Sequence, residues 1–382
     1  MSLEFFDYTT LRIIWWVLLG VLLISFAVMD GFDLGVGILL PWVAKNDKER
    51  RVTLNTIGPV WEGNQVWFIL GGGAIFAAWP ALYAVSFSGF YFAMLLVLLA
   101  LILRPVGFKY RSKVTHAGWR KAADGALFLG GFVPTLLFGV AVGNVIQGVP
   151  FHFDDTLRAY YTGSLLGLLN PFALLCGLVS VAMLTLHGGT YLAVKTEGAI
   201  QMRSIRYARI AGLLFILLFI LGGYWMAHGI QGYHLNAAML TDAASNPLHK
   251  SVSAAAGEWF NRYKAYPLFY AVPAAGLISA LLAVLLLSTG FHRTAWVSSA
   301  LAVSAAIATV GMTMFPFILP SSTHPDMSLM VWDASSSKLT LGIMLLAAAI
   351  FVPLILVYTS WVYYILRGKV TSSTIESSKD AY

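Results

Sequence analysis

Residues 59–67 read Pro-Val-Trp-Glu-Gly-Asn-Gln-Val-Trp, and they lie inside a hydrophobic run that extends from about residue 57 to 78. The stretch holds one acid, two amides and two indole rings where apolar side chains are expected. A second polar stretch, Asp-Gly-Phe-Asp-Leu-Gly-Val-Gly at residues 30–37, interrupts the preceding hydrophobic run. Ionisable side chains at membrane depth are costly and usually face a bundle interior or a water-filled cavity. Together the two stretches predict helices packed around buried polar groups.

The composition is that of a membrane protein. Of the 382 residues, 59% are hydrophobic and only 11% are charged, whereas soluble domains carry about 25% charged residues. The net charge of +7 needs no nucleic acid to explain it, because helical membrane proteins collect Lys and Arg in their cytoplasmic loops. The single cysteine, Cys176, excludes an intrachain disulfide and a cysteine-based metal cluster within the chain.

Nine hydrophobic segments are long enough to span a bilayer, which takes about 20 apolar residues. We therefore predict an all-α, polytopic integral membrane protein with nine transmembrane helices, organised as a single domain over residues 1–382. The predicted helices cover approximately residues 11–42, 55–78, 81–104, 122–146, 164–187, 208–229, 267–290, 295–319 and 339–366.

Basic residues set the expected orientation. If the N-terminus is periplasmic, most Lys and Arg fall in loops on the cytoplasmic side, at residues 45–51, 104–121, 195–209 and 367–379. This assignment places Arg104 at the inner end of the third segment. The positive-inside rule then predicts a periplasmic N-terminus and a cytoplasmic C-terminus, which requires an odd number of helices.

Three acids, Asp30, Asp33 and Glu62, lie at a similar distance from the predicted inner membrane surface, roughly 16 to 22 Å at the helical rise per residue. Asp30 and Asp33 are three residues apart and share one helix face. A carboxyl removed from water holds its proton to a higher pH, so the acids could form a proton-accessible cluster reached from the cytoplasm. The alternative is structural: hydrogen-bonded helix clamps paired with Asn64, Gln65 or an Arg of a neighbouring chain.

For the other polar and aromatic residues of the stretch 59–67, a structural role is favoured over a functional one. Asn64 and Gln65 are expected to support the bundle through hydrogen bonds between helices, as amides do in bilayers. Trp61 and Trp67 are six residues apart, and packing is the favoured role for both. The less favoured hypothesis is that Trp67 lines a passage for a gas or a quinone.

Haem enzymes in membranes need axial ligands, most often histidine. His187 and His228 fall at the ends of predicted segments, and no histidine is expected to be buried in the middle of a helix. The other histidines fall in predicted loops: His116, His152, His234, His249, His292 and His324. Haem ligation by this chain is therefore not expected. No phosphate-binding loop, zinc spacing or nucleophile motif is present, and no metal site is predicted.

Linked motifs spread over nearly the whole chain point to a known family. They lie at residues 12–16, 27–37, 61–67, 76–80, 87–91, 104–108, 143–151, 160–163, 169–172, 314–323 and 332–340. With these motifs the chain resembles subunit II of the cytochrome bd quinol oxidases of bacterial respiratory membranes.

The resemblance implies a multi-pass subunit, in the bacterial cytoplasmic (inner) membrane, of a complex that oxidises quinol and reduces dioxygen to water. It implies that subunit I ligates the haems b and d, that this chain carries no catalytic residue, and that small single-helix subunits join. It also implies a structural ubiquinone, and a proton route from the cytoplasm through this subunit.

Within the family pattern, the acid of the Trp-acid-Gly-Asn-Gln motif is the candidate for the proton route, and here it is Glu62. Some relatives have Asp at this position, preceded by His-Trp. This chain has Val60-Trp61 instead, so a relay through that histidine has no counterpart. Trp67 matches the tryptophan that the family places at an oxygen passage toward haem d.

Two other functions remain open at this point. Buried acids and proline-interrupted helices also suit a proton-coupled secondary transporter, although the sequence shows no internal repeat and no central Arg or Lys for a substrate. A purely structural partner of a haem subunit is the third hypothesis.

Overall fold

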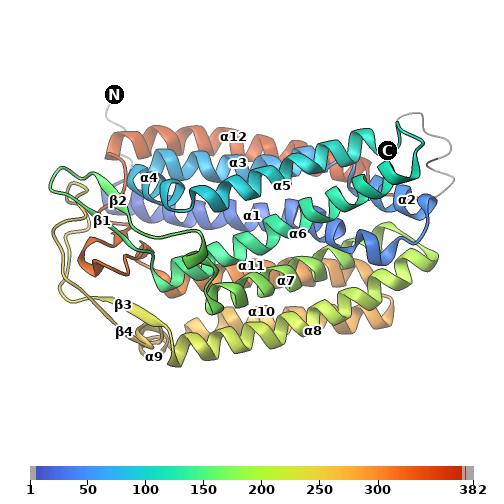
Figure 1. Ribbon diagram of the computed structural model, residues 1–382. Coiled ribbons are helices and arrows are strands. Elements are labelled where there is room, and N and C mark those ends of the chain that lie inside the picture. Colours follow the sequence, from blue (N-terminus) through green and yellow to red (C-terminus); the bar gives the residue numbers. More distant parts are fainter. Residues whose placement is uncertain (1–5, 372–374, 376–382) are drawn as a thin grey trace.

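The computed structural model describes residues 6–371 and residue 375, and most of them are helical. Long helices lie side by side in one bundle, and short hairpins gather at one of its ends (Figure 1). The helices are α1 Tyr8–Val43, α2 Asp47–Ile57, α3 Trp61–Ala78, α4 Pro80–Gly89, α5 Tyr91–Tyr110, α6 Ala117–Gln147, α7 Pro171–Lys195, α8 Gly198–His228, α9 Asn261–Ala265, α10 Ala271–Thr289, α11 His292–Met314 and α12 Lys338–Ile365.

Three antiparallel hairpins add to the all-α prediction. They pair β1 Phe151–Phe153 with β2 Ala159–Tyr161, β3 Gln231–Leu235 with β4 Val252–Ala256, and β5 Phe317–Leu319 with β6 Leu329–Met330. The predicted helix at residues 295–319 was therefore too long. Its real end is Met314, because Pro316 lacks a backbone N–H and disfavours helical geometry at the residue before it.

Eight of the described helical stretches are long and apolar enough to cross a membrane: α1, α5, α6, α7, α8, Pro267–Thr289 with α10, α11 and α12. The second predicted segment corresponds to α3, which packs along α1 but is not one of the eight. The first two turns of α3 carry Glu62, Asn64 and Gln65. The count of nine spans and the single-domain organisation therefore stay predictions.

The third predicted helix, residues 81–104, is wrong as one element. It is divided into α4 and α5, and the division falls at Phe90, after Gly89. Gly89 lies against β2, where an added Cβ would be 2.5 Å from the ring of Tyr161. After this break α5 continues to Tyr110, so Arg104 lies inside a helix and not in a loop.

The fifth predicted helix, residues 164–187, is displaced along the chain. Helix α7 begins at Pro171 and ends at Lys195. The Asn170 side chain accepts a hydrogen bond from the backbone N–H of Ala173, and proline suits the first helical turn. This capping fixes the later start, and the helix then extends two turns beyond the predicted end.

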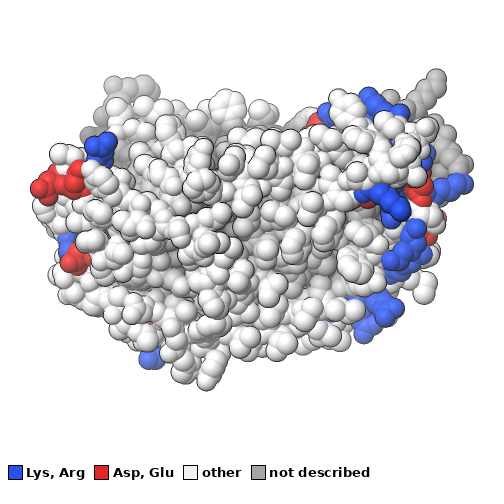
Figure 2. Space-filling model, in the orientation of Figure 1, with Lys and Arg blue, Asp and Glu red and all other residues white. Residues whose placement is uncertain are grey.

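Charged side chains are distributed unevenly over the bundle. Figure 2 shows most Lys and Arg of this face at the end formed by α2 and by the connection between α5 and α6, called the basic end below. Helix α1 begins at the opposite end, and α12 finishes at the basic end (Figure 1). The membrane side that each end faces stays a prediction.

The opposite end is closed by buried charges. Lys250 donates to Asp333 at 2.6 Å, and each side chain is 1% exposed. Burial raises the pKa of the Asp333 carboxyl and lowers the pKa of the Lys250 ammonium. Arg12, fully buried near the start of α1, donates to Ser335 and to the Thr241 carbonyl. These contacts fasten the two long loops of this end to the first helix.

Glycines allow α1 and α7 to approach closely. An added Cβ at Gly35 would lie 2.0 Å from the carbonyl oxygen of Leu184, and one at Gly188 would lie 2.5 Å from the backbone of Gly35. Small residues of this kind let membrane helices pack backbone to backbone. The polar residues of α1 owe their position to this contact.

We expect Gly35→Ala to destabilise the protein by about 1–3 kcal/mol, because the obstructing atoms are backbone and cannot rotate away. The measurement is the thermal unfolding midpoint of the detergent-purified protein. Gly20→Ala, on the same helix with no atom within 4 Å of the added Cβ, is the matched control and should stay near wild type. Equal midpoints for the two variants would contradict the proposed close contact.

Candidate functional site

Asp30 of α1 and Arg104 of α5 form an ion pair inside the bundle. Arg104 donates from Nη2 to Oδ1 at 2.9 Å and from Nη1 to Oδ2 at 3.2 Å. The two side chains are 1% and 3% exposed. Two parallel bonds of this kind fix the geometry as well as the charge. The arginine that neutralises this acid therefore belongs to the chain itself and not to a neighbouring chain.

Asp33, one turn further along α1, joins a different chain of hydrogen bonds. Its Oδ2 accepts from the Asn64 amide at 2.7 Å, and the Asn64 carbonyl oxygen accepts from the Tyr363 hydroxyl at 2.8 Å. This arrangement links α1, α3 and α12. The second carboxyl oxygen, Oδ1, is buried and has no hydrogen-bond partner within the described part of the chain. Asn64 thus hydrogen-bonds to both α1 and α12, and its supporting role stays a prediction.

A small cavity lies beside Asp33 and Arg104. It leaves about 10 Å³ to the centre of a water-sized sphere, which is close to the minimum that one water molecule needs. Its walls are Asp33, Gly37, Leu54, Ile57, Arg104, Phe108, Leu127 and Gly131. The cavity is therefore lined by one acid and one arginine among otherwise apolar residues and glycines.

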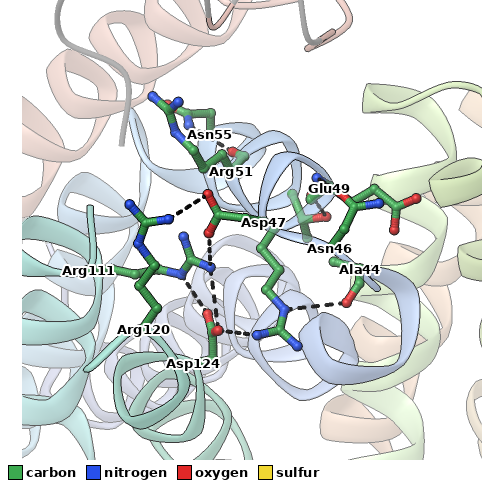
Figure 3. Close-up of polar contacts among 11 residues, drawn as sticks. Ala44, Asn46, Asp47, Glu49, Arg51, Asn55, Arg111, Arg120 and Asp124 are labelled. Atoms are coloured by element: carbon green, nitrogen blue, oxygen red, sulfur yellow. Dashed lines mark hydrogen bonds and ion pairs between the residues drawn. The ribbon is translucent and has the colours of Figure 1, made fainter. Parts of the chain in front are cut away.

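A second ionic network lies at the basic end. Arg111 donates to Asp124 at 2.6 Å and to Asp47 at 2.9 Å, and Arg120 donates to Asp47 at 3.2 Å (Figure 3). Arg50 also donates to Asp124, so this carboxylate is held by two guanidinium groups. The network ties α2, α5 and α6 together.

Helical spacing relates this network to the cavity. On α5, Phe108 lies three residues before Arg111; on α6, Leu127 lies three residues after Asp124. Residues three apart in a helix are neighbours on one face. Phe108 on α5 and Leu127 on α6 therefore each lie about one helical turn from the ionic network, between that network and the cavity lined by Asp33.

Glu62 does not join the buried acids. It lies in the first turn of α3 with its side chain 60% exposed, and it pairs with Lys109 at 2.9 Å. Asn64 is two residues further on, about 200° around the helix, and that difference turns Asn64 inward and Glu62 outward. The predicted cluster of three acids is thus two buried acids and one surface acid in the isolated chain.

The other predicted residues of α3 lie on its packed side. Trp61 is buried and stacks on Phe108 with ring centroids 5.1 Å apart, beneath the Arg104 guanidinium. Trp67 is 4% exposed and belongs to the hydrophobic core. Gln65 is half-buried. Packing is therefore visible for both tryptophans.

The prediction that no histidine is buried within a helix is wrong for His187. Because α7 continues to Lys195, His187 lies well inside it and is fully buried. Its Nδ1 is 2.8 Å from the Ser299 hydroxyl and its Nε2 is 2.9 Å from the Val28 carbonyl oxygen. Both ring nitrogens are used. Within the described residues no group of His, Cys, Asp and Glu could hold a metal ion.

Comparison with known proteins shows which family has this fold and these motifs. The family model of cytochrome bd terminal oxidase subunit II matches residues 11–366. The chain is 50% identical over 370 residues to cytochrome bd-I ubiquinol oxidase subunit 2 of Escherichia coli (strain K12), covering 97% of this chain and 98% of that protein. It is 31% identical over 366 residues to cytochrome bd ubiquinol oxidase subunit 2 of Bacillus subtilis (strain 168), covering 95% and 97%.

A solved structure agrees in fold. The bd oxidase from Geobacillus thermodenitrificans contains a chain that superposes with a TM-score of 0.69 at 15% identity, covering 94% of this chain and 100% of that chain. The fold and the relatives first define the class, a multi-helix membrane subunit of a bacterial terminal oxidase. Within that class, the chain belongs to the cytochrome bd terminal oxidase subunit II family.

We expect Arg104→Gln to destabilise the bundle by about 3–5 kcal/mol, because it leaves the Asp30 carboxylate buried without its countercharge. The double variant with Asp30→Asn removes both charges and should recover part of this loss. The unfolding midpoint of the purified complex measures both effects.

Arg293→Gln is the control, because Arg293 is an exposed arginine at the start of α11. Surface substitutions usually stay within about 0.5 kcal/mol of wild type. Equal midpoints for Arg104→Gln and Arg293→Gln would show that the buried pair has no structural role.

Proposed function

We propose that this chain is the subunit of a quinol oxidase complex that delivers protons to a haem-bearing partner, subunit I, where quinol is oxidised and dioxygen is reduced to water. Asp33 carries this proposal: it is a buried acid with one unpartnered oxygen beside a cavity. Family membership supports the oxidase context and removes the transporter hypothesis. The complex would lie in the bacterial inner membrane, with the N-terminus periplasmic and the C-terminus cytoplasmic.

The haems b and d are assigned to the partner because the described residues offer poor ligands. Both nitrogens of the fully buried His187 already have hydrogen-bond partners. An axial ligand needs a free ring nitrogen that faces the iron. A structural ubiquinone and small single-helix subunits remain proposals that rest on the family resemblance.

The two buried acids have different roles in this proposal. Asp30 receives two hydrogen bonds from Arg104, so its charge is neutralised in place and it serves to position α1 and α5. Asp33 receives one hydrogen bond on Oδ2, and Oδ1 is left for a proton or a water molecule. Asp33 is therefore the proton-holding residue, and Asn64 is the group that orients it.

Glu62 has a separate place in the route. A carboxylate and an ammonium on the outer face of a helix are expensive against lipid. Because Glu62 and Lys109 form such an exposed pair, this face of α3 and α5 suits a protein partner better than acyl chains. We therefore place Glu62 at the boundary with subunit I, where it would exchange protons with that subunit.

One further surface bears on the partner. Helix α12 is almost entirely exposed in the isolated chain, and among its described residues only Leu341 is buried. Its apolar side would be covered by lipid, by subunit I or by small subunits.

Trp67 is kept as the proposed residue of an oxygen passage, on the basis of the family resemblance. Its packed indole supports a structural role equally well.

In the complete complex, we expect Asp33→Asn to lower quinol-dependent oxygen consumption by at least about tenfold, since positioned proton transfer contributes 10²-fold or more. The replacement has the same shape, so the haem content in the reduced-minus-oxidised spectrum should not change. Asp33→Glu should restore part of the turnover.

Three companion variants sharpen this test. Asp155→Asn, at an exposed loop acid, is the control and should leave turnover unchanged. Glu62→Gln should lower turnover with normal haem content, whereas Asp30→Asn should mainly lower the yield of assembled complex. Wild-type turnover and proton uptake in Asp33→Asn would refute the proton role and leave the structural-partner hypothesis.

A further inference from the structure

A larger cavity lies at the end of the bundle opposite the basic end, among β4, α9 and the end of α8 (Figure 1). Its volume of about 340 Å³ is at the lower end of the range for small-ligand sites. Its walls are Ala227, His228, Ala256, Gly257, Glu258, Phe260, Asn261, Lys264 and Tyr270. None of these residues takes part in the proposed proton route.

The cavity carries charges of both signs. Glu258 is fixed on one wall: its Oε1 accepts from the Asn261 amide at 2.7 Å and lies 3.4 Å from His234 Nδ1. Lys264 lines the same cavity and has no ion-pair partner in the described structure. A ligand with both an anionic and a cationic group would therefore find a countercharge for each.

His228 offers a third polar contact. Its Nδ1 lies 3.0 Å from the Tyr224 carbonyl oxygen, to which it can only donate, and its ring lies against the ring of that tyrosine in a tilted arrangement with centroids 4.5 Å apart. The ring is thus held in one orientation. Its Nε2 has no partner within the described chain and is available to a ligand in the cavity.

The position of the cavity indicates where such a ligand comes from. His228 is the last residue of α8, and Tyr270 directly precedes α10; both helices belong to membrane-spanning candidates. The cavity therefore opens at the depth where lipid headgroups lie. Strongly exposed apolar side chains, Leu268 at 82% and Tyr266 at 63%, flank this level and would contact acyl chains.

We propose that this cavity binds the headgroup of a phospholipid that carries a phosphate and a primary ammonium, as phosphatidylethanolamine does. Lys264 and His228 face the phosphate. Glu258 accepts from the ammonium, and the rings of Phe260 and Tyr270 provide an electron-rich wall beside it. The inference is independent of the proton route.

The chemistry distinguishes this headgroup from its common alternatives. A glycerol headgroup has no positive charge, so it would leave the Glu258 carboxylate beside a net anion. A choline headgroup has the charge but no N–H, so it cannot donate to the carboxylate. An ethanolamine headgroup offers a phosphate to Lys264 and an ammonium that can donate to Glu258.

The test uses the purified, delipidated oxidase complex with the full chain. Short-chain dihexanoyl phosphatidylethanolamine is titrated, and bound lipid is counted by intact-complex mass spectrometry. We expect Lys264→Gln to weaken ethanolamine-lipid binding by about tenfold, because a charge-assisted bond to phosphate is lost. Lys338→Gln, at an exposed lysine at the start of α12, is the matched control and should bind like wild type.

Two comparisons identify the ligand. The wild-type complex should bind the glycerol and choline lipids of equal chain length about tenfold more weakly, and Glu258→Gln should remove that preference. Equal binding by Lys264→Gln and Lys338→Gln, or equal binding of the three lipids to wild type, would overturn the proposal. Free phosphoethanolamine bound as tightly as the lipid would overturn the membrane source of the ligand.

Discussion

One ion pair buried inside the helical bundle, between the carboxylate of Asp30 and the guanidinium of Arg104, determines how the surrounding helices pack. Asp30 and Arg104 can remain charged inside the bundle only because their bidentate contact is complete. That contact fixes α1 against α5, and it requires glycine on α6, since a Cβ at Gly130 would lie 2.8 Å from the Arg104 side chain. Asp33 then lies one turn away in a fixed position, with Asn64 bonded to one of its oxygens, and its side chain lines the small cavity. The polar interior is thus a consequence of one ion pair and of the small residues that surround it.

Much of the fold was accessible from the sequence, because apolar length and capping residues are local signals. The nine apolar segments each overlap a long described helix, and the acids at Asp30 and Asp33 were recognised as interior. Hydropathy could not show that α4 and α5 are separate, or that Arg104 lies within a helix, since a continuous apolar run hides such breaks. It also could not predict which way Glu62 points; two residues of helix separate it from Asn64 and turn it to the surface. For α7, the Asn170-Pro171 pair was the signal that could have corrected both its start and the burial of His187.

The two ends of the bundle differ in how far their paired charged side chains are exposed to water. At the basic end, arginines and aspartates form a network that joins α2, α5 and α6 and extends from the buried Arg111 and Asp124 to the exposed Asp47 (Figure 3). At the opposite end, Lys250 and Asp333 are sealed away from water and Arg12 is fully buried among loop carbonyls and hydroxyls. The first arrangement is partly open to water at Asp47. The second fastens loops and excludes water, and the cavity lined by Lys264 and Glu258 lies at the same end of the bundle.

The sequence distance between charged partners has a consequence for how the protein is made. Asp30 enters the membrane 74 residues before Arg104 has been synthesised, and Arg12 precedes Ser335 by 323 residues. During translation α1 is therefore inserted with unpaired ionic groups, and only its apolar length keeps it in the lipid. Its two buried ionic groups gain their partners at different times: Asp30 when α5 arrives, and Arg12 when the loop around Thr241 and then the loop before α12 are complete. A chain truncated before that loop lacks the Ser335 hydroxyl, which is the acceptor for Nε of Arg12.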